Sequence, residues 1–86
     1  MKFLAALLVG ASVAYACGDN AYRCKNPDAD VGEMYEVTKK ICDQLGEDTC
    51  WCYHLAEDYC DPSGDNIQKF KDMCENHGGN WYWSEC

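Results

Sequence analysis

The stretch from Cys50 to His54 contains the residue types that most readily bind a metal ion, in the order Cys-x-Cys-x-His. Thiolate and imidazole groups are the usual ligands of zinc, but structural zinc sites need four ligands, and no second pair with matching spacing follows. The chain has eight cysteines, and thiols in an oxidising compartment form disulfides. We therefore predict that Cys50 and Cys52 are structural half-cystines and that the chain holds no metal.

His54 is the strongest candidate for acid–base chemistry. If residues 49–59 form a helix, Glu57 and Asp58 lie one turn away and could orient the imidazole. This stretch resembles the helix that carries the catalytic histidine of secreted phospholipases, in which an aspartate follows the histidine directly and helps to bind calcium. Here Leu55 follows His54, and there is no separate glycine-rich calcium loop. We therefore predict no catalytic residue, no enzymatic activity and no cofactor.

Asp48, two residues before Cys50-x-Cys52, gives a second local resemblance. It is similar to the eight-cysteine helical domains of fungal extracellular proteins, some of which bind haem through an aspartate shortly before a Cys-x-Cys. The remaining cysteine spacing differs from that family, notably in the long gap from Cys24 to Cys42. Haem binding is therefore only an alternative.

Residues 1–16 have the composition of a cleavable export signal. Lys2 supplies a positive start, an apolar run follows, and Ala14 and Ala16 stand at the positions that signal peptidase reads. The apolar run is shorter than the ~20 residues that a bilayer-spanning helix needs. We expect a secreted extracellular protein with no membrane association, whose mature chain is a single domain over residues 17–86.

An even number of cysteines in so short an extracellular chain predicts a fully paired disulfide framework. The half-cystines are Cys17, Cys24, Cys42, Cys50, Cys52, Cys60, Cys74 and Cys86. They allow about a hundred pairings, so the sequence does not determine the connectivity. Antiparallel packing of three helices favours a Cys24–Cys60 bond, with Cys17 and Cys86 tying the two ends to the helices.

Three stretches have apolar residues at helical spacing. The first is expected over residues 30–47, with Asp30 as N-cap, and the second covers residues 49–59. The third begins with Asp65 and Gln68 as a capping box and stops at two glycines, residues 78 and 79.

The two flanks lack helical spacing. Residues 17–28 are polar and predict a loop, whereas residues 80–86 are aromatic and predict an extended segment. The expected fold class is therefore all-α: a small disulfide-stapled three-helix domain with an irregular N-terminal loop and an extended aromatic C-terminal tail.

The tail sequence Trp81-Tyr82-Trp83 is the candidate partner-binding site. In an extended segment Trp81 and Trp83 point one way and Tyr82 the other. If the tryptophans face the helices, they complete a thin core. If they face water, they form an anchor for a protein partner or a platform for a sugar ring.

The charge of the chain excludes several classes of partner. The sequence has 15 acidic against seven basic residues, a formal charge of −8, and loss of Lys2 with the export signal makes it −9. Such a field repels phosphate backbones and anionic lipid headgroups. We expect no nucleic-acid binding and no electrostatic lysis of anionic membranes, and we expect a monomer.

The export signal, short length, acidic mature chain and eight cysteines together resemble the small secreted cysteine-rich proteins of filamentous fungi. The resemblance implies a non-enzymatic, effector-like virulence protein that binds an unknown extracellular host or microbial protein, or a glycan. A toxin or antimicrobial polypeptide with a protein receptor is the first alternative. An inhibitor of a secreted hydrolase is another, with residues 61–64, next to Cys60, as its exposed loop.

Overall fold

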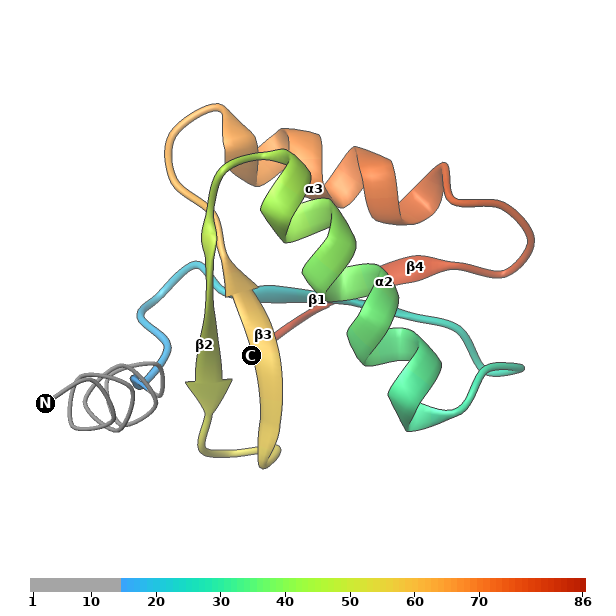
Figure 1. Cartoon of the computed structure of the whole chain (residues 1–86), viewed down its shortest axis with the longest axis horizontal. Coiled ribbons are helices and arrows are strands. Elements are labelled where there is room, and N and C mark those ends of the chain that lie inside the picture. The colour runs from blue at the N-terminus through green and yellow to red at the C-terminus, as the bar shows by residue number, and fades with distance from the viewer. Residues whose placement is uncertain (1–14) are drawn as a thin grey trace, which may run out of the picture.

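The computed structural model describes residues 15–86, in which it shows two helices and four strands (Figure 1). Most of the predicted export signal, residues 1–14, lies outside the described residues. The elements follow the chain in the order β1 (Tyr22–Lys25), α2 (Val31–Gln44), β2 (Asp48–Cys52), β3 (Glu57–Asp61), α3 (Asn66–Glu75) and β4 (Tyr82–Glu85). In this described part, neither helix has the length and apolar character that crossing a membrane would require.

The four strands form one antiparallel sheet in the order β2-β3-β1-β4. β2 and β3 pair as a hairpin that begins with Asp48 opposite Asp61 and ends with Cys52 opposite Glu57. β4 pairs with β1 along its whole length. α2 packs on β1 and β3, and α3 packs on β1 and β4. The two helices lie on the same face of the sheet and contact each other there (Figure 1). β1 is therefore the strand that both helices cover.

The predicted all-α, three-helix fold is wrong, because the chain folds as a mixed α/β domain. Residues 49–59, predicted as the second helix, form most of the β2–β3 hairpin. Cys50 and Cys52 explain the difference: they would point about 200° apart on a helix but share one face of a strand. Both are buried in one cluster with Tyr59, whereas Leu55, an apolar residue within the expected helix, is exposed in the hairpin turn.

The predicted N-terminal loop over residues 17–28 is also wrong in part, because it contains β1. Tyr22 and Cys24 are buried under the helices, and Arg23 between them is buried as well. A strand of four residues that includes an arginine has too little apolar alternation for the sequence to reveal it. The polar stretch therefore supplies the strand that both helices cover.

The first predicted helix is confirmed as α2, although it ends at Gln44 and not at residue 47. The carboxylate of Asp30 caps it by accepting a hydrogen bond from the backbone N–H of Glu33 at 2.7 Å. α3 follows Asp65, but the predicted capping box does not form. Asp65 makes no side-chain cap hydrogen bond, and the side-chain amide of Gln68 donates instead to Asp72 at 2.9 Å.

The buried side chains form two clusters. The larger one lies between the helices and the sheet and consists of Tyr22, Cys24, Val37, Ile41, Cys42, Cys60, Phe70 and Cys74. The smaller one contains no helix residue and consists of Ala21, Cys50, Cys52 and Tyr59, with Cys17 and Cys86 packed against it. Because Tyr59 and Cys60 are neighbours in β3, their side chains lie on opposite faces of the sheet. Each face is thus covered, one by helices and the other by the chain ends.

Four disulfides pair all eight cysteines, which confirms the predicted framework. The bonds join Cys17 to Cys50, Cys24 to Cys74, Cys42 to Cys60, and Cys52 to Cys86. The favoured Cys24–Cys60 pairing is wrong, because it was based on a helix that does not form. In the sheet, each of these two cysteines lies under a different helix, so each bonds to that helix.

Arg23 is a charged residue inside the structure, with 1% of its surface exposed. Its guanidinium donates to the backbone oxygens of Asp58 at 2.8 Å and Val31 at 3.2 Å. It lies 3.9 Å from the Glu57 carboxylate and 6.0 Å from the centre of the Tyr59 ring. Arg23 therefore links β1 to β3 and to the start of α2 through a single side chain.

Candidate functional site

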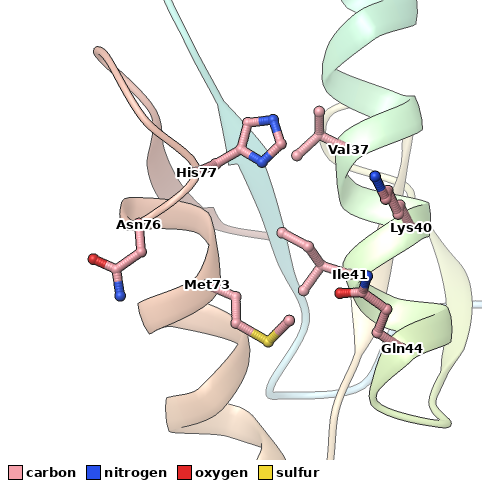
Figure 2. A pocket seen from close by; sticks show the side chains of 7 residues that line it. All are labelled: Val37, Lys40, Ile41, Gln44, Met73, Asn76 and His77. Atoms are coloured by element: carbon pink, nitrogen blue, oxygen red, sulfur yellow. The ribbon is translucent and has the colours of Figure 1, made fainter.

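A groove runs between α2 and the end of α3 and has a volume of about 250 Å³ (Figure 2). We call it the helix groove. It is lined by Val37, Lys40, Ile41, Gln44, Met73, Asn76 and His77. Val37 and Ile41 are buried members of the core, and Met73 packs against that core while it is still partly exposed. The floor of the helix groove is therefore apolar and reaches solvent.

The rim of the helix groove is polar, and none of the lining residues is acidic. Lys40 and Gln44 stand on α2, and Asn76 and His77 follow α3; all four are exposed. In a chain with more than twice as many acidic as basic residues, this rim offers a lysine, an imidazole and two amides. The arrangement suits a ligand that has an apolar body and a carboxylate at its edge.

Disulfides hold both walls of the helix groove. Cys42, next to Ile41 on α2, is bonded to Cys60 in β3. Cys74, next to Met73 on α3, is bonded to Cys24 in β1. Because Ile41 and Met73 are each one position from a covalent link to the sheet, the spacing of the two helices is fixed before any ligand binds. A fixed groove loses less conformational entropy on binding than a mobile one.

The predicted partner-binding residues of the tail lie at β4 and divide between core and surface. Trp81 and Trp83 are partly buried against the main core. The rings of Trp83 and Tyr22 pack edge to face, with their centres 5.5 Å apart. The ammonium group of Lys71 lies 4.3 Å from the centre of the Trp83 ring. Tyr82 is the exposed member, with 46% of its surface accessible. The tail adjoins the helix groove, because the ring of Trp81 packs edge to face with that of His77, which lines the groove; the two ring centres are 5.1 Å apart.

The other residues with possible chemistry do not form a site together. His54 is exposed in the β2–β3 turn, and Glu57 and Asp58 belong to β3, so no helical turn brings them together. Among residues 15–86, no group of three His, Cys, Asp or Glu side chains is placed to hold a metal ion. A polar hollow of about 360 Å³ adjoins His54 and is lined by Cys17, Gly18, Asp19, Trp51, Tyr53, His54 and Cys86.

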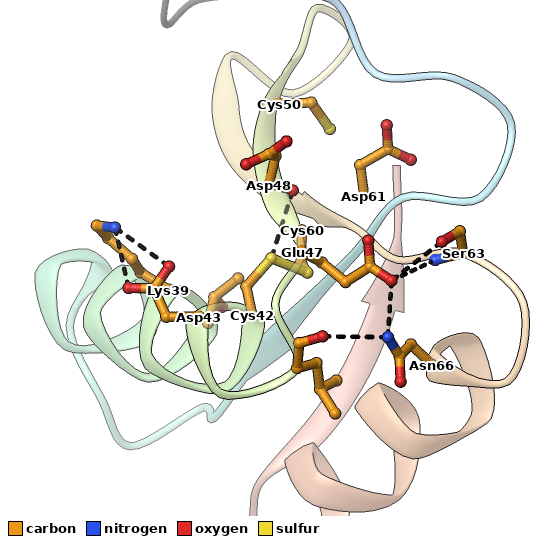
Figure 3. The surroundings of a disulfide bond; sticks show 12 residues. Lys39, Cys42, Asp43, Glu47, Asp48, Cys50, Cys60, Asp61, Ser63 and Asn66 are labelled. Carbon is orange, nitrogen blue, oxygen red and sulfur yellow. Dashed lines mark hydrogen bonds and ion pairs between the residues drawn. A yellow bond between two sulfur atoms is a disulfide. The ribbon is translucent and has the colours of Figure 1, made fainter.

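The exposed loop at Ser63 is held by a single carboxylate near the Cys42–Cys60 bond (Figure 3). Oε2 of Glu47 accepts hydrogen bonds from the Asn66 side chain at 2.8 Å and from the Ser63 hydroxyl and backbone N–H at 3.0 and 3.1 Å. These bonds, that from Asn66 first, hold the pKa of Glu47 below its usual 4.5. Glu47 thereby joins the α2–β2 turn to the start of α3.

The Glu47 bonds predict a specific acid sensitivity. Since the pKa of Glu47 is lower in the folded chain, the unfolded chain takes up this proton first as the pH falls. The stability contributed by this carboxylate is complete above about pH 4.5 and is lost as the pH falls through the lower, folded pKa. Glu47→Gln should therefore lose less stability than the parent between pH 7 and pH 3, measured by urea unfolding. Asp65→Asn, which alters no cap hydrogen bond, should behave as the parent does.

The sequence did not reveal the helix groove. None of the residues that line it is among the candidate site residues that the sequence indicates. The detectable signal is the four-residue spacing from Val37 to Ile41, which places both residues on one helix face. Met73 lies on α3, and His77 comes just after the end of that helix. Nothing in the sequence shows that these two parts of the chain meet, because that depends on the sheet beneath them.

The fold and the site define a small α/β domain with four disulfides and an amphipathic groove. Comparison with protein families, with curated proteins and with solved structures finds no match to this chain. We therefore infer function from the chain's own geometry and charge.

Proposed function

We propose that this chain is a secreted, non-enzymatic, effector-like protein that binds an extracellular partner protein of a host or competing microbe through the helix groove. The observation that carries the proposal is the apolar floor with a basic and amide rim, fixed by two disulfides, on an acidic protein. Four disulfides in so small a domain are consistent with an extracellular protein.

The groove indicates the chemistry of the partner. A single large apolar side chain fits a hollow of about 250 Å³, with its body on Ile41 and Met73. A carboxylate next to that side chain would reach the ammonium group of Lys40 at the rim. The partner segment is therefore an exposed apolar residue flanked by aspartate or glutamate. Aromatic or aliphatic anchors that fill a preformed pocket account for most of the energy in such interfaces.

The test is affinity capture from host or microbial extracellular fluid with the oxidised, secreted protein as bait. Lys40→Glu should reduce the recovered partner by about tenfold or more, because it places like charges together at the rim. Lys69→Glu is the matched control, since Lys69 is also an exposed lysine on a helix but does not line the groove. Equal capture by the parent and Lys40→Glu would exclude the groove as the binding site.

One observation favours a second function, inhibition of a secreted hydrolase. The exposed Ser63 is held by Glu47, and Pro62 beside it is buried, so this loop is rigid and accessible, as an inhibitory loop must be. An inhibitor would lose activity on Ser63→Trp and keep it on Lys40→Glu. The effector proposal predicts the reverse pattern of partner capture.

A further inference from the structure

The outer edge of β2 is the second feature that points to a partner. β2 is an edge strand of the sheet, and residues 15–17 lie along it in parallel, with Ala16 bridged to Trp51. The backbone N–H of Trp51 donates to the Tyr15 oxygen at 2.7 Å, and the N–H of Cys17 donates to the Trp51 oxygen at 3.0 Å. This edge therefore accepts an extended segment through ordinary sheet hydrogen bonds.

The end of the edge where Tyr15 lies is acidic. Asp48 and Asp61 are directly opposite each other in the hairpin, an arrangement that is unfavourable for like charges. The Tyr15 hydroxyl donates to Asp61 at 3.5 Å. Burial, followed by the charges of Asp61, Asp48 and Glu47, raises the pKa of Tyr15, which shows a negative field at this point. Among residues 15–86, none of these three carboxylates has a basic group within ion-pair distance.

Export would open this edge. Cleavage after Ala16 removes Tyr15 and Ala16. The N–H of Trp51 then loses its acceptor, the Tyr15 oxygen, and Asp61 loses its contact with the Tyr15 hydroxyl. Cys17 stays in place, because it is bonded to Cys50. Its nitrogen, 3.0 Å from the Trp51 oxygen, becomes the amino terminus and carries a positive charge at neutral pH. The vacated place thus has an ammonium group at one end and three carboxylates toward the other.

We propose that, in the mature protein, the β2 edge binds the extended carboxyl-terminal tail of a partner protein. The second-to-last residue of this tail is basic. The tail lies parallel to β2, as residues 15 and 16 do, and its basic side chain faces Asp61 and Asp48. Its terminal carboxylate meets the Cys17 ammonium group, and a backbone oxygen accepts the N–H of Trp51. Strand addition of this kind takes affinity from backbone hydrogen bonds and specificity from side-chain positions. The inference rests on the predicted export but not on the helix groove.

The first test is the amino terminus of the secreted protein, measured by intact mass. It should begin at Cys17; a mature chain that keeps Tyr15 and Ala16 would overturn this proposal and leave the groove test unaffected.

The second test is a titration of that protein with the peptide acetyl-Ser-Val-Ala-Lys-Ala, followed by NMR. The backbone amide signal of Trp51 should shift, and the same peptide with a C-terminal amide, or with Glu in place of Lys, should bind about tenfold more weakly. Asp61→Asn should weaken binding of the Lys peptide, whereas Asp43→Asn, at an exposed acidic residue outside this edge, should not. No shift at Trp51, or equal affinity for all three peptides, would overturn the proposal.

Discussion

Replacing Cys24 and Cys74 together with alanine should lower the free energy of unfolding by about 4 kcal/mol. Their disulfide links residues separated by 50 positions, the widest separation of the four, and restricts the unfolded chain most. It also links α3 to β1, the strand that both helices cover. Since a core of this size supplies only ~3–5 kcal/mol by itself, this loss is comparable to the contribution of the whole core.

The matched control is the Cys42→Ala, Cys60→Ala variant, which opens a separation of 18 residues. It should cost about 3 kcal/mol, because a shorter closed loop restricts the unfolded chain less. Urea unfolding followed by tryptophan fluorescence measures both variants. If the variant lacking the 18-residue link is the less stable of the two, the loss is dominated by local packing of α2 and not by restriction of the unfolded chain.

Arg23→Met should destabilise the protein by about 3–5 kcal/mol, an effect comparable to the loss of a disulfide. The substitution removes charge-assisted hydrogen bonds to two backbone oxygens, those of Asp58 and Val31. It also removes one of the two β1 cations near Glu57, whose carboxylate keeps Lys25 at 3.7 Å. Arg23→Lys should recover only part of the loss, because a single ammonium group lacks the fork that reaches both oxygens.

Lys71→Met provides the control for Arg23. Lys71 contacts the rings of Tyr22 and Trp83 but is only partly buried, so its removal should cost less than ~1 kcal/mol. Thermal unfolding at neutral pH compares the variants. An Arg23→Met protein as stable as Lys71→Met would show that the buried guanidinium is dispensable and that apolar packing replaces it.

The sequence predicts the local features of this fold better than its architecture. Asp30 caps α2 as its side-chain chemistry indicates, and all eight cysteines pair as their number indicates. The β2–β3 hairpin was missed because its residues also satisfy helical spacing. What favours the strand over the helix is that Cys50 bonds to Cys17 and Cys52 bonds to Cys86. Both bonds join residues that are far apart in the sequence.

The candidate sites differ in the same way. Trp81, Tyr82 and Trp83 were recognisable from composition, and the structure puts the two tryptophans against the core and Tyr82 outside. The helix groove was not recognisable, because neither Lys40 on α2 nor His77 after α3 belongs to a local motif. Two disulfides and a sheet bring them to the same rim, and no local pattern encodes that meeting.

Site-specific photo-crosslinking tests the groove proposal most directly. A benzoylphenylalanine at position 44, which lines the helix groove, is compared with one at position 69, where the lysine is exposed and does not line the groove. Both oxidised proteins are exposed to the same extracellular fluid and irradiated. We expect a crosslinked partner from position 44 that disappears on Lys40→Glu, and none from position 69. A crosslink from position 69 alone, or one from position 44 that survives Lys40→Glu unchanged, would contradict the groove proposal.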